Sequence, residues 1–120
     1  MVTDKTLYEL LSDYFRVYLP QFKKRSEHTI RSYRTALNSL LDFVAADKKI
    51  KLAEITFEMI DAPMIAKYLA HLDEQGNSLT TRNLRLNCIK AFYSYAAEMN
   101  KEAIAFNTAI SKIPKATVPQ

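Results

Sequence analysis

Residues 26–46 read SEHTIRSYRTALNSLLDFVAA, and this stretch decides the fold. Its apolar side chains recur every three or four residues, which is the spacing of one face of an α-helix. They are Ile30, Tyr33, Leu37, Leu40, Leu41 and Val44. Ser26 stands where a hydroxyl can accept a hydrogen bond from a free backbone N–H group of the first turn. The pattern predicts an amphipathic helix over 27–46 that buries one face in a core.

The chain before this stretch predicts a second helix, over 6–19. Thr6 and Glu9 have the spacing of a capping box, in which each side chain satisfies a free backbone donor of the first turn. Proline lacks an N–H group and blocks the preceding turn, so we expect the helix to stop at Pro20. On the other side of residues 26–46, residues 52–57 fit a short extended or turn segment.

The chain after residue 60 predicts two more helices and allows a short fifth. Asp61 can cap the first of them, and Gly76, the only glycine, can end it in a left-handed conformation. Ser78 can cap the next, over 78–100, whose apolar positions are spread widely enough to place it at the centre of the fold. Residues 103–110 can add the short fifth helix.

Composition and patterning together favour a single all-α domain. The chain has 120 residues, of which 48% are hydrophobic, enough for a real core. No alternating apolar pattern of strand length occurs, so we predict a four-helix bundle to which the fifth helix can be added. We assign residues 1–111 to this domain. Residues 112–120, with Pro114 and Pro119, fit the start of an extended linker.

Features that the sequence lacks limit the cellular compartment and the chemistry that we expect for this protein. A single cysteine, Cys88, cannot form an internal disulfide, and no apolar run approaches 18 residues, so we expect a cytoplasmic protein with no membrane contact. His28 and His71 lack neighbouring cysteine or carboxylate partners, and Cys88 lies on an apolar stripe. We therefore expect no metal, no cofactor and no catalytic residue in this chain.

The positive charge is concentrated in two windows. The chain carries a net charge of +4, yet residues 23–34 alone carry +4 and residues 77–97 carry +3. Both windows fall at predicted helix starts and mix cations with Ser, Thr or Asn. Helix starts and hydroxyls donate to phosphate oxygens, and Arg and Asn can reach base edges. This pattern indicates a nucleic-acid binder, although charge runs are also common on ordinary solvated surfaces.

The order of these segments resembles a known family. Residues 26–37, SEHTIRSYRTAL, are similar to the S-x-x-T-[LI]-x-x-Y-x-x-x-L opening of the core-binding, SAM-like domain of tyrosine recombinases and phage integrases. Residues 80–96, TTRNLRLNCIKAFYSYA, resemble that domain's last long helix, and residues 110–116 resemble the linker to the catalytic domain. The family often has Asn-Pro after the long helix, where this chain has Asn107-Thr108.

The resemblance implies that this chain is one jaw of a clamp around duplex DNA and is not an enzyme alone. The family cuts DNA through a C-terminal domain with an Arg, a Lys, a His-x-x-Arg motif and a tyrosine nucleophile. We interpret the HTIR sequence at 28–31 as a coincidence, because those partners are missing. The implied DNA-binding residues, on the two basic helices, are Lys24, Thr29, Arg31, Arg34, Thr81, Arg82, Asn83 and Lys90, with Arg82 and Asn83 nearest to base edges.

The same resemblance implies a bacterial or phage origin, a full-length homotetramer on DNA and a monomeric fragment. Two other functions stay open. One is a helical protein-interaction module whose basic face meets an acidic partner, with Leu86 and Tyr93 as exposed anchors. The other is a stand-alone DNA-binding protein without a catalytic half.

Overall fold

The computed structural model describes residues 5–117, which are helical along most of their length and contain no β-strand. The elements, in chain order, are α1 (Leu7–Asp13), the π-helix η1 (Tyr14–Phe22), α2 (Glu27–Lys48), the 3₁₀ turns η2 (Leu52–Glu54) and η3 (Phe57–Met59), α3 (Ala62–Glu74), α4 (Leu79–Met99) and α5 (Lys101–Ser111). The prediction of an all-α bundle with a short fifth helix is confirmed.

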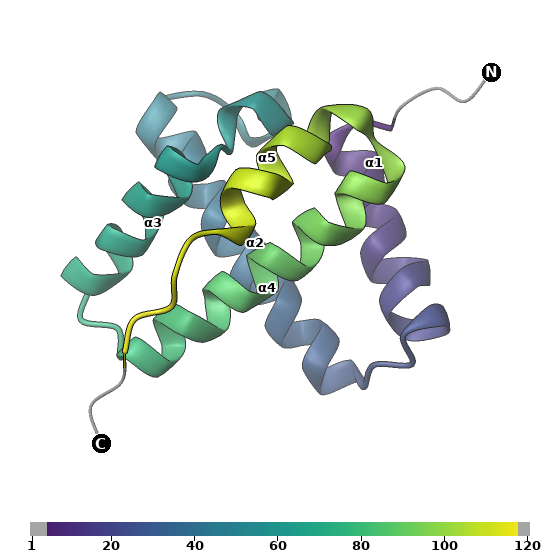
Figure 1. Cartoon of the computed structure of the whole chain (residues 1–120), viewed down its shortest axis with the longest axis horizontal. Coiled ribbons are helices and arrows are strands. Elements are labelled where there is room, and N and C mark those ends of the chain that lie inside the picture. Colours follow the sequence, from purple (N-terminus) through teal and green to yellow (C-terminus); the bar gives the residue numbers. More distant parts are fainter. Residues whose placement is uncertain (1–4, 118–120) are drawn as a thin grey trace.

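Helix α4 is the central element, as its broad apolar surface predicted. It contacts α2, α3 and α5. In Figure 1, α2 passes behind α4, α3 lies at the left edge, and α1 with η1 lies at the right edge. The last described residues run as an extended segment from the end of α5 down toward the start of α4. This arrangement brings the starts of α2 and α4 to the same end of the molecule.

Side-chain caps begin the helices where the sequence predicted them. Thr6 and Glu9 form the capping box of α1. Asp61 accepts a hydrogen bond from the Met64 amide at the start of α3, with an N···O distance of 3.0 Å. Gly76, just beyond α3, has a φ of +80°, a conformation that costs other residues more. Each cap satisfies a backbone group that would otherwise lack a partner.

The prediction that the first helix stops at Pro20 is wrong. The chain continues beyond Asp13 as a π-helix to Phe22, with Pro20 inside it. The Lys23 amide donates to the Tyr18 carbonyl, five residues earlier, at 2.8 Å. This wider turn keeps the helix hydrogen-bonded on the far side of Pro20, so the missing N–H group does not end it.

Other boundaries differ less. Helix α2 extends two residues further than predicted, to Lys48. The segment 52–57 contributes to two 3₁₀ turns, so the turn, one of its two predicted forms, is confirmed. Helix α5 starts earlier, at Lys101, because Asn100 caps it by accepting a hydrogen bond from the Glu102 amide at 2.8 Å. The buried Asn100 side chain also donates to the Lys5 carbonyl, at 2.6 Å, and so ties the α4–α5 junction to the start of the fold.

An aromatic cluster fills the core between η1, η3 and α4. Phe92 is 1% exposed, and its ring packs edge-on against Tyr14 with a centroid distance of 5.3 Å. Tyr93 is equally buried and donates its hydroxyl hydrogen to the Ile60 carbonyl at 2.8 Å. This hydrogen bond removes the cost of burying a phenol. Together these rings join the central helix to elements far away in the sequence.

The exposed face of α4 differs from the predicted one. Leu84 and Met99, two apolar residues of this helix, are about half exposed. Leu86 and Tyr93, expected to be exposed, are buried at 0% and 1% exposure. Because α2, α3 and α5 all pack on α4, its buried surface is too wide for one stripe to define. Leu86 and Tyr93 therefore cannot be the exposed anchors of a protein-interaction module.

Cys88 is confirmed as a core residue, and this predicts a pH effect. Burial raises the pKa of its thiol from 9.0 to about 11. Between about pH 9 and 11 the unfolded chain loses this proton while the folded chain keeps it, so stability falls as pH rises, by up to about 1.4 kcal/mol per pH unit. Urea unfolding at a series of pH values should show this fall.

The control for the Cys88 prediction is Cys88→Ala, which removes the thiol proton. Burial also raises the pKa of Tyr14 and Tyr93, so some alkaline destabilisation should persist above about pH 10. The variant should lose the part of the slope that begins near pH 9. An identical slope in both proteins would show that the thiol does not couple to folding.

Candidate nucleic-acid interface

The two basic helices begin with the same capping arrangement, built on the spacing S-x-x-T. Ser26 accepts a hydrogen bond from the Thr29 amide at 3.2 Å, and its hydroxyl donates to Thr29 Oγ1 at 3.1 Å. Ser78 makes the same two bonds to Thr81, both at 3.1 Å. Among residues 5–117 neither threonine hydroxyl hydrogen has an acceptor, so both can donate to a ligand oxygen at a helix start.

These two starts line one groove. From α2 it is lined by His28, Arg31, Ser32, Thr35 and Ala36, and from α4 by Thr81, Leu84 and Arg85. Its volume is about 270 Å³. The lining holds two arginines and no carboxylate, so the groove is an electropositive surface between two helices. We call it the α2–α4 groove. Of the predicted DNA-binding residues, it brings together Arg31 and Thr81.

Arg85 is held in place within the α2–α4 groove. Its guanidinium donates to Ser39 Oγ at 3.1 Å and to the Tyr68 hydroxyl at 3.3 Å. Tyr68 in turn donates to Ser39 at 2.8 Å. This network joins α2, α3 and α4 and orients a half-buried cation before any ligand arrives, which lowers the entropy cost of using it.

The α2–α4 groove opens into a larger depression. Thr35 and Arg85 line both, and the second, of about 700 Å³, continues between α2 and the end of α3. Its lining includes Asp42, His71 and Asn77. A carboxylate here opposes the Arg85 charge, so the electropositive character is greatest near the helix starts and decreases toward α3.

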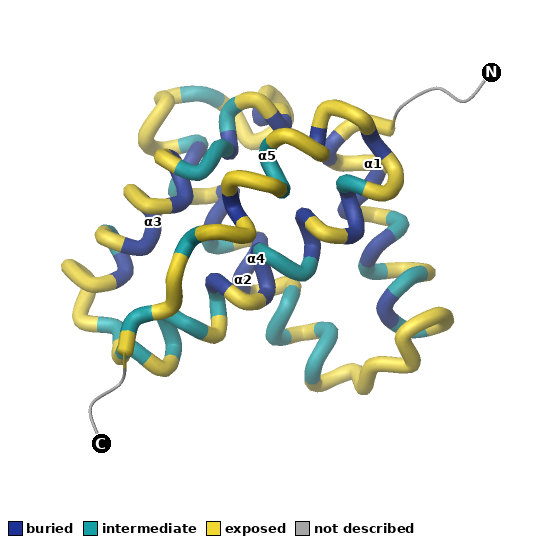
Figure 2. Tube along the Cα trace, in the orientation of Figure 1, coloured by how far each residue is buried: buried dark blue, intermediate teal, exposed yellow. Residues whose placement is uncertain are grey.

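The loop before α2 adds exposed cations. Lys23, Lys24 and Arg25 are all exposed, and Figure 2 shows the loop at the lower right as exposed along its length. Lys24 has a φ of +53°, which is uncommon for a residue with a side chain. Arg34, by contrast, lies outside the groove: its guanidinium stacks over the Phe15 ring at 4.9 Å and so faces η1.

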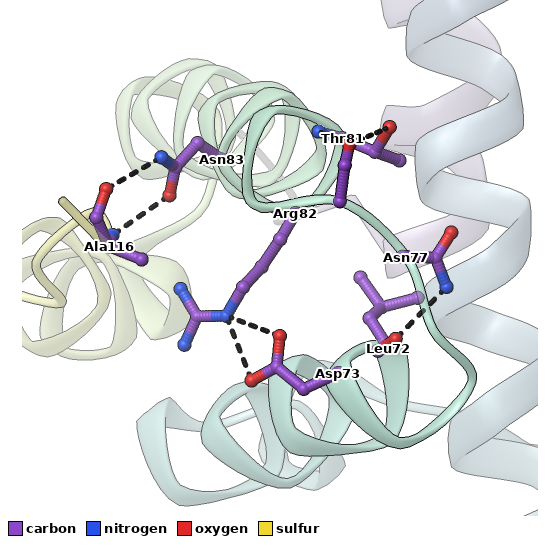
Figure 3. A network of polar contacts seen from close by, with 8 residues as sticks. Leu72, Asp73, Asn77, Thr81, Arg82, Asn83 and Ala116 are labelled. Atoms are coloured by element: carbon purple, nitrogen blue, oxygen red, sulfur yellow. Dashed lines mark hydrogen bonds and ion pairs between the residues drawn. The ribbon is translucent and has the colours of Figure 1, made fainter. Parts of the chain in front are cut away.

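Arg82, a predicted DNA contact in the second basic window, has a carboxylate partner. Its Nε donates to Asp73 at the end of α3, with an N···O distance of 3.2 Å to the nearer oxygen (Figure 3). Its Nη1 atom is buried and has no acceptor among the described residues. Arg82 thus links α3 to α4 and faces away from the α2–α4 groove.

Asn83 and Lys90 face the C-terminal segment of the chain. The Asn83 side chain both donates to and accepts from the backbone of Ala116 (Figure 3). Lys90 donates to the Ile113 carbonyl. The predicted DNA-contact residues of α4 therefore face three directions. Thr81 faces α2, Arg82 faces α3, and Asn83 and Lys90 face residues 113–116.

The family assignment comes from comparison with known proteins. A family model described as the N-terminal SAM-like domain of phage integrase matches residues 12–100, most of the chain. The chain belongs to this family. The match contains α2, α3 and α4 entirely, and with them both helix starts that form the α2–α4 groove. The resemblance seen in the two sequence motifs is confirmed.

Curated relatives of this integrase domain are longer proteins. The y4rC protein of Sinorhizobium fredii, named as a candidate integrase/recombinase, is 40% identical over 98 residues, which cover 81% of this chain and 30% of the relative. Its y4rD protein, similarly named, is 32% identical over 88% of this chain and 38% of the relative. Tyrosine recombinase XerC of Pelotomaculum thermopropionicum is 35% identical over 69% of this chain and 27% of the relative.

The chain thus spans under two fifths of the length of these relatives. No solved structure matches it significantly. Among the described residues of the integrase domain, no helix is both long and apolar enough to cross a membrane. Nor do three or more His, Cys, Asp or Glu side chains gather in a way that could hold a metal ion.

Sequence reasoning missed Arg85 as a candidate site residue of the integrase domain. Arg85 follows Thr81 by four residues and Leu84 by one, and these three line the α2–α4 groove together. Residues four apart share a helix face, whereas Arg82 and Asn83 are rotated by about 100° and 200° from Thr81. The spacing from Thr81 was the signal that could have found Arg85. His28 also lines the groove.

Proposed function

We propose that this domain binds duplex DNA along the α2–α4 groove. The observation that carries the proposal is the convergence of two hydroxyl-capped helix starts on a groove that contains Arg31 and Arg85 and no carboxylate. Helix starts bear a partial positive charge, and their hydroxyl and amide groups donate to phosphate oxygens. The exposed cations Lys23, Lys24 and Arg25 extend this surface beyond α2.

We propose different roles for the residues predicted from the sequence, according to where each lies relative to the groove. Arg31, Thr29 and Thr81 are proposed phosphate contacts, with Lys24 at the edge of the surface. Arg85 is added as a cation oriented by Ser39 and Tyr68. Arg34, Arg82, Asn83 and Lys90 stay predictions as DNA contacts, and each has an intramolecular partner that DNA would have to share or displace.

The family and the relatives' names support a role in a larger recombinase. We propose that the domain holds DNA while residues outside these 120 cleave and rejoin the strands, with the two parts closing around the duplex as a clamp. Residues 1–111 would form the DNA-holding part and residues 112–120 the beginning of the connection. The full-length protein would act as a homotetramer on DNA in a bacterial cytoplasm, whereas this chain alone would be a monomer without cleavage activity.

A salt titration of duplex binding tests this function. If about five phosphates are neutralised, the logarithm of the affinity should fall with the logarithm of the salt concentration with a slope near −4 to −5. Fluorescence anisotropy with a labelled duplex at 50–200 mM salt would measure it. If the domain binds no duplex even at the lowest salt but binds an acidic protein tightly, the result would instead support the interaction-module alternative.

A further inference from the structure

The outer face of α4 binds an extended stretch of backbone. The Asn83 Nδ2 group donates to the Ala116 carbonyl at 2.8 Å, and the Ala116 amide donates to Asn83 Oδ1 at 2.9 Å (Figure 3). One side-chain amide thereby satisfies both backbone groups of one residue, as a neighbouring β-strand would. Such a paired contact fixes orientation as well as position.

A second attachment lies two helical turns further along α4. Lys90 donates to the Ile113 carbonyl. Residues 83 and 90 are about 10.5 Å apart along a helix axis, at about 1.5 Å per residue. Residues 113 to 116 span about 10 Å when extended, at about 3.3 Å per residue. The two spacings agree, so the segment fits antiparallel to α4 with both anchors engaged at once.

The segment itself is suited to this position. Pro114 has no N–H group to satisfy and restricts the residue before it, Ile113, to extended conformations. The Ile113 side chain packs, partly buried, against the core. The segment therefore loses little conformational freedom on docking, since its most restricted residue is already extended in the unfolded chain.

We propose that Asn83 is a positioning residue that anchors residues 113–116 to α4 and so sets where, and in which direction, the chain leaves this domain. The point at which the chain leaves the domain would then be Ala116 and not Lys112, the C-cap of α5. The anchor uses the same donor and acceptor pair with which an asparagine reads adenine, so Asn83 cannot hold the segment and read a base edge together.

Asn83→Ala in this chain tests the proposal, with Asn87→Ala as the matched control. Asn87 is exposed on the same helix between the two anchors, and it takes no part in the hydrogen bonds that hold residues 113–116 among the described residues. Two readouts report on the segment: hydrogen exchange of the Ala116 amide, and trypsin cleavage after Lys115 followed by mass spectrometry. Both follow the population in which the segment is detached.

Asn83→Ala should raise both rates by roughly ten-fold, as expected for the loss of two hydrogen bonds, whereas Asn87→Ala should leave them unchanged. Unchanged rates in Asn83→Ala would overturn the proposal, and a loss of duplex affinity without faster cleavage would do so in favour of base reading. Because neither rate requires DNA, the result stands even if the proposed DNA binding fails.

Discussion

Replacing Phe92 by alanine is expected to destabilise the folded domain by about 3–5 kcal/mol, the range for removal of a large buried aromatic ring. Phe92 is 1% exposed and contacts Tyr14 from η1 and Phe57 from η3 as well as its neighbours on α4. Its loss would leave a cavity where three elements meet. Since small domains have a total stability of about 5–15 kcal/mol, the variant should be partly unfolded at moderate urea concentrations.

The matched control is Phe22→Ala, the same chemical change at a side chain that is 73% exposed. It should alter stability by no more than about 0.5 kcal/mol. Urea unfolding followed by circular dichroism would measure both variants, and Phe92→Leu would give an intermediate value in a folded protein. Equal unfolding midpoints for the two alanine variants would contradict the assignment of Phe92 to the core.

Reversing the charge of Arg31 should weaken duplex binding roughly 10–100-fold at about 0.1 M salt, because a charge-assisted phosphate contact is replaced by repulsion. Arg31 is exposed, lines the α2–α4 groove and has no intramolecular acceptor among the described residues. Arg31→Glu should therefore leave stability nearly unchanged. It should also reduce the slope of the logarithm of affinity against the logarithm of salt concentration by about one in magnitude, because one phosphate contact is lost.

Lys101→Glu is the matched control for Arg31→Glu, since it makes the same change in net charge at an exposed position of α5 that does not line the groove. Its affinity should fall only slightly, through long-range electrostatics that salt screens. Anisotropy titrations of both variants would measure the difference. Similar losses in both would mean that the net charge, and not the groove, accounts for binding.

The fold was largely predictable because its signals are local. The caps at Thr6, Ser26, Asp61 and Ser78 and the left-handed Gly76 each depend on residues within one turn, and all were found where expected. The end of the first helix was not, because a π-helix depends on hydrogen bonds that span one more residue than the usual pattern assumes. A boundary predicted from residue propensity alone therefore ends that helix too early.

The candidate site was predictable only in part. The sequence places cations and hydroxyls at two helix starts, and the structure brings Arg31 and Thr81 together as that pattern suggested. It could not show that Asn83 and Lys90 contact residues 113–116, because these contacts join positions 33 and 23 residues apart in the chain. Nor could it show that Arg85 is oriented by Ser39 and Tyr68.

By itself, then, the sequence determined the helices, their caps, the family and the two concentrations of charge, since each is encoded by periodicity, short spacing or composition. The tertiary structure decided which way each side chain of α4 faces. That helix is packed by α2, α3 and α5, so a rotation of about 100° between neighbouring residues separates a side chain in the groove from one that holds α3 or the exit segment.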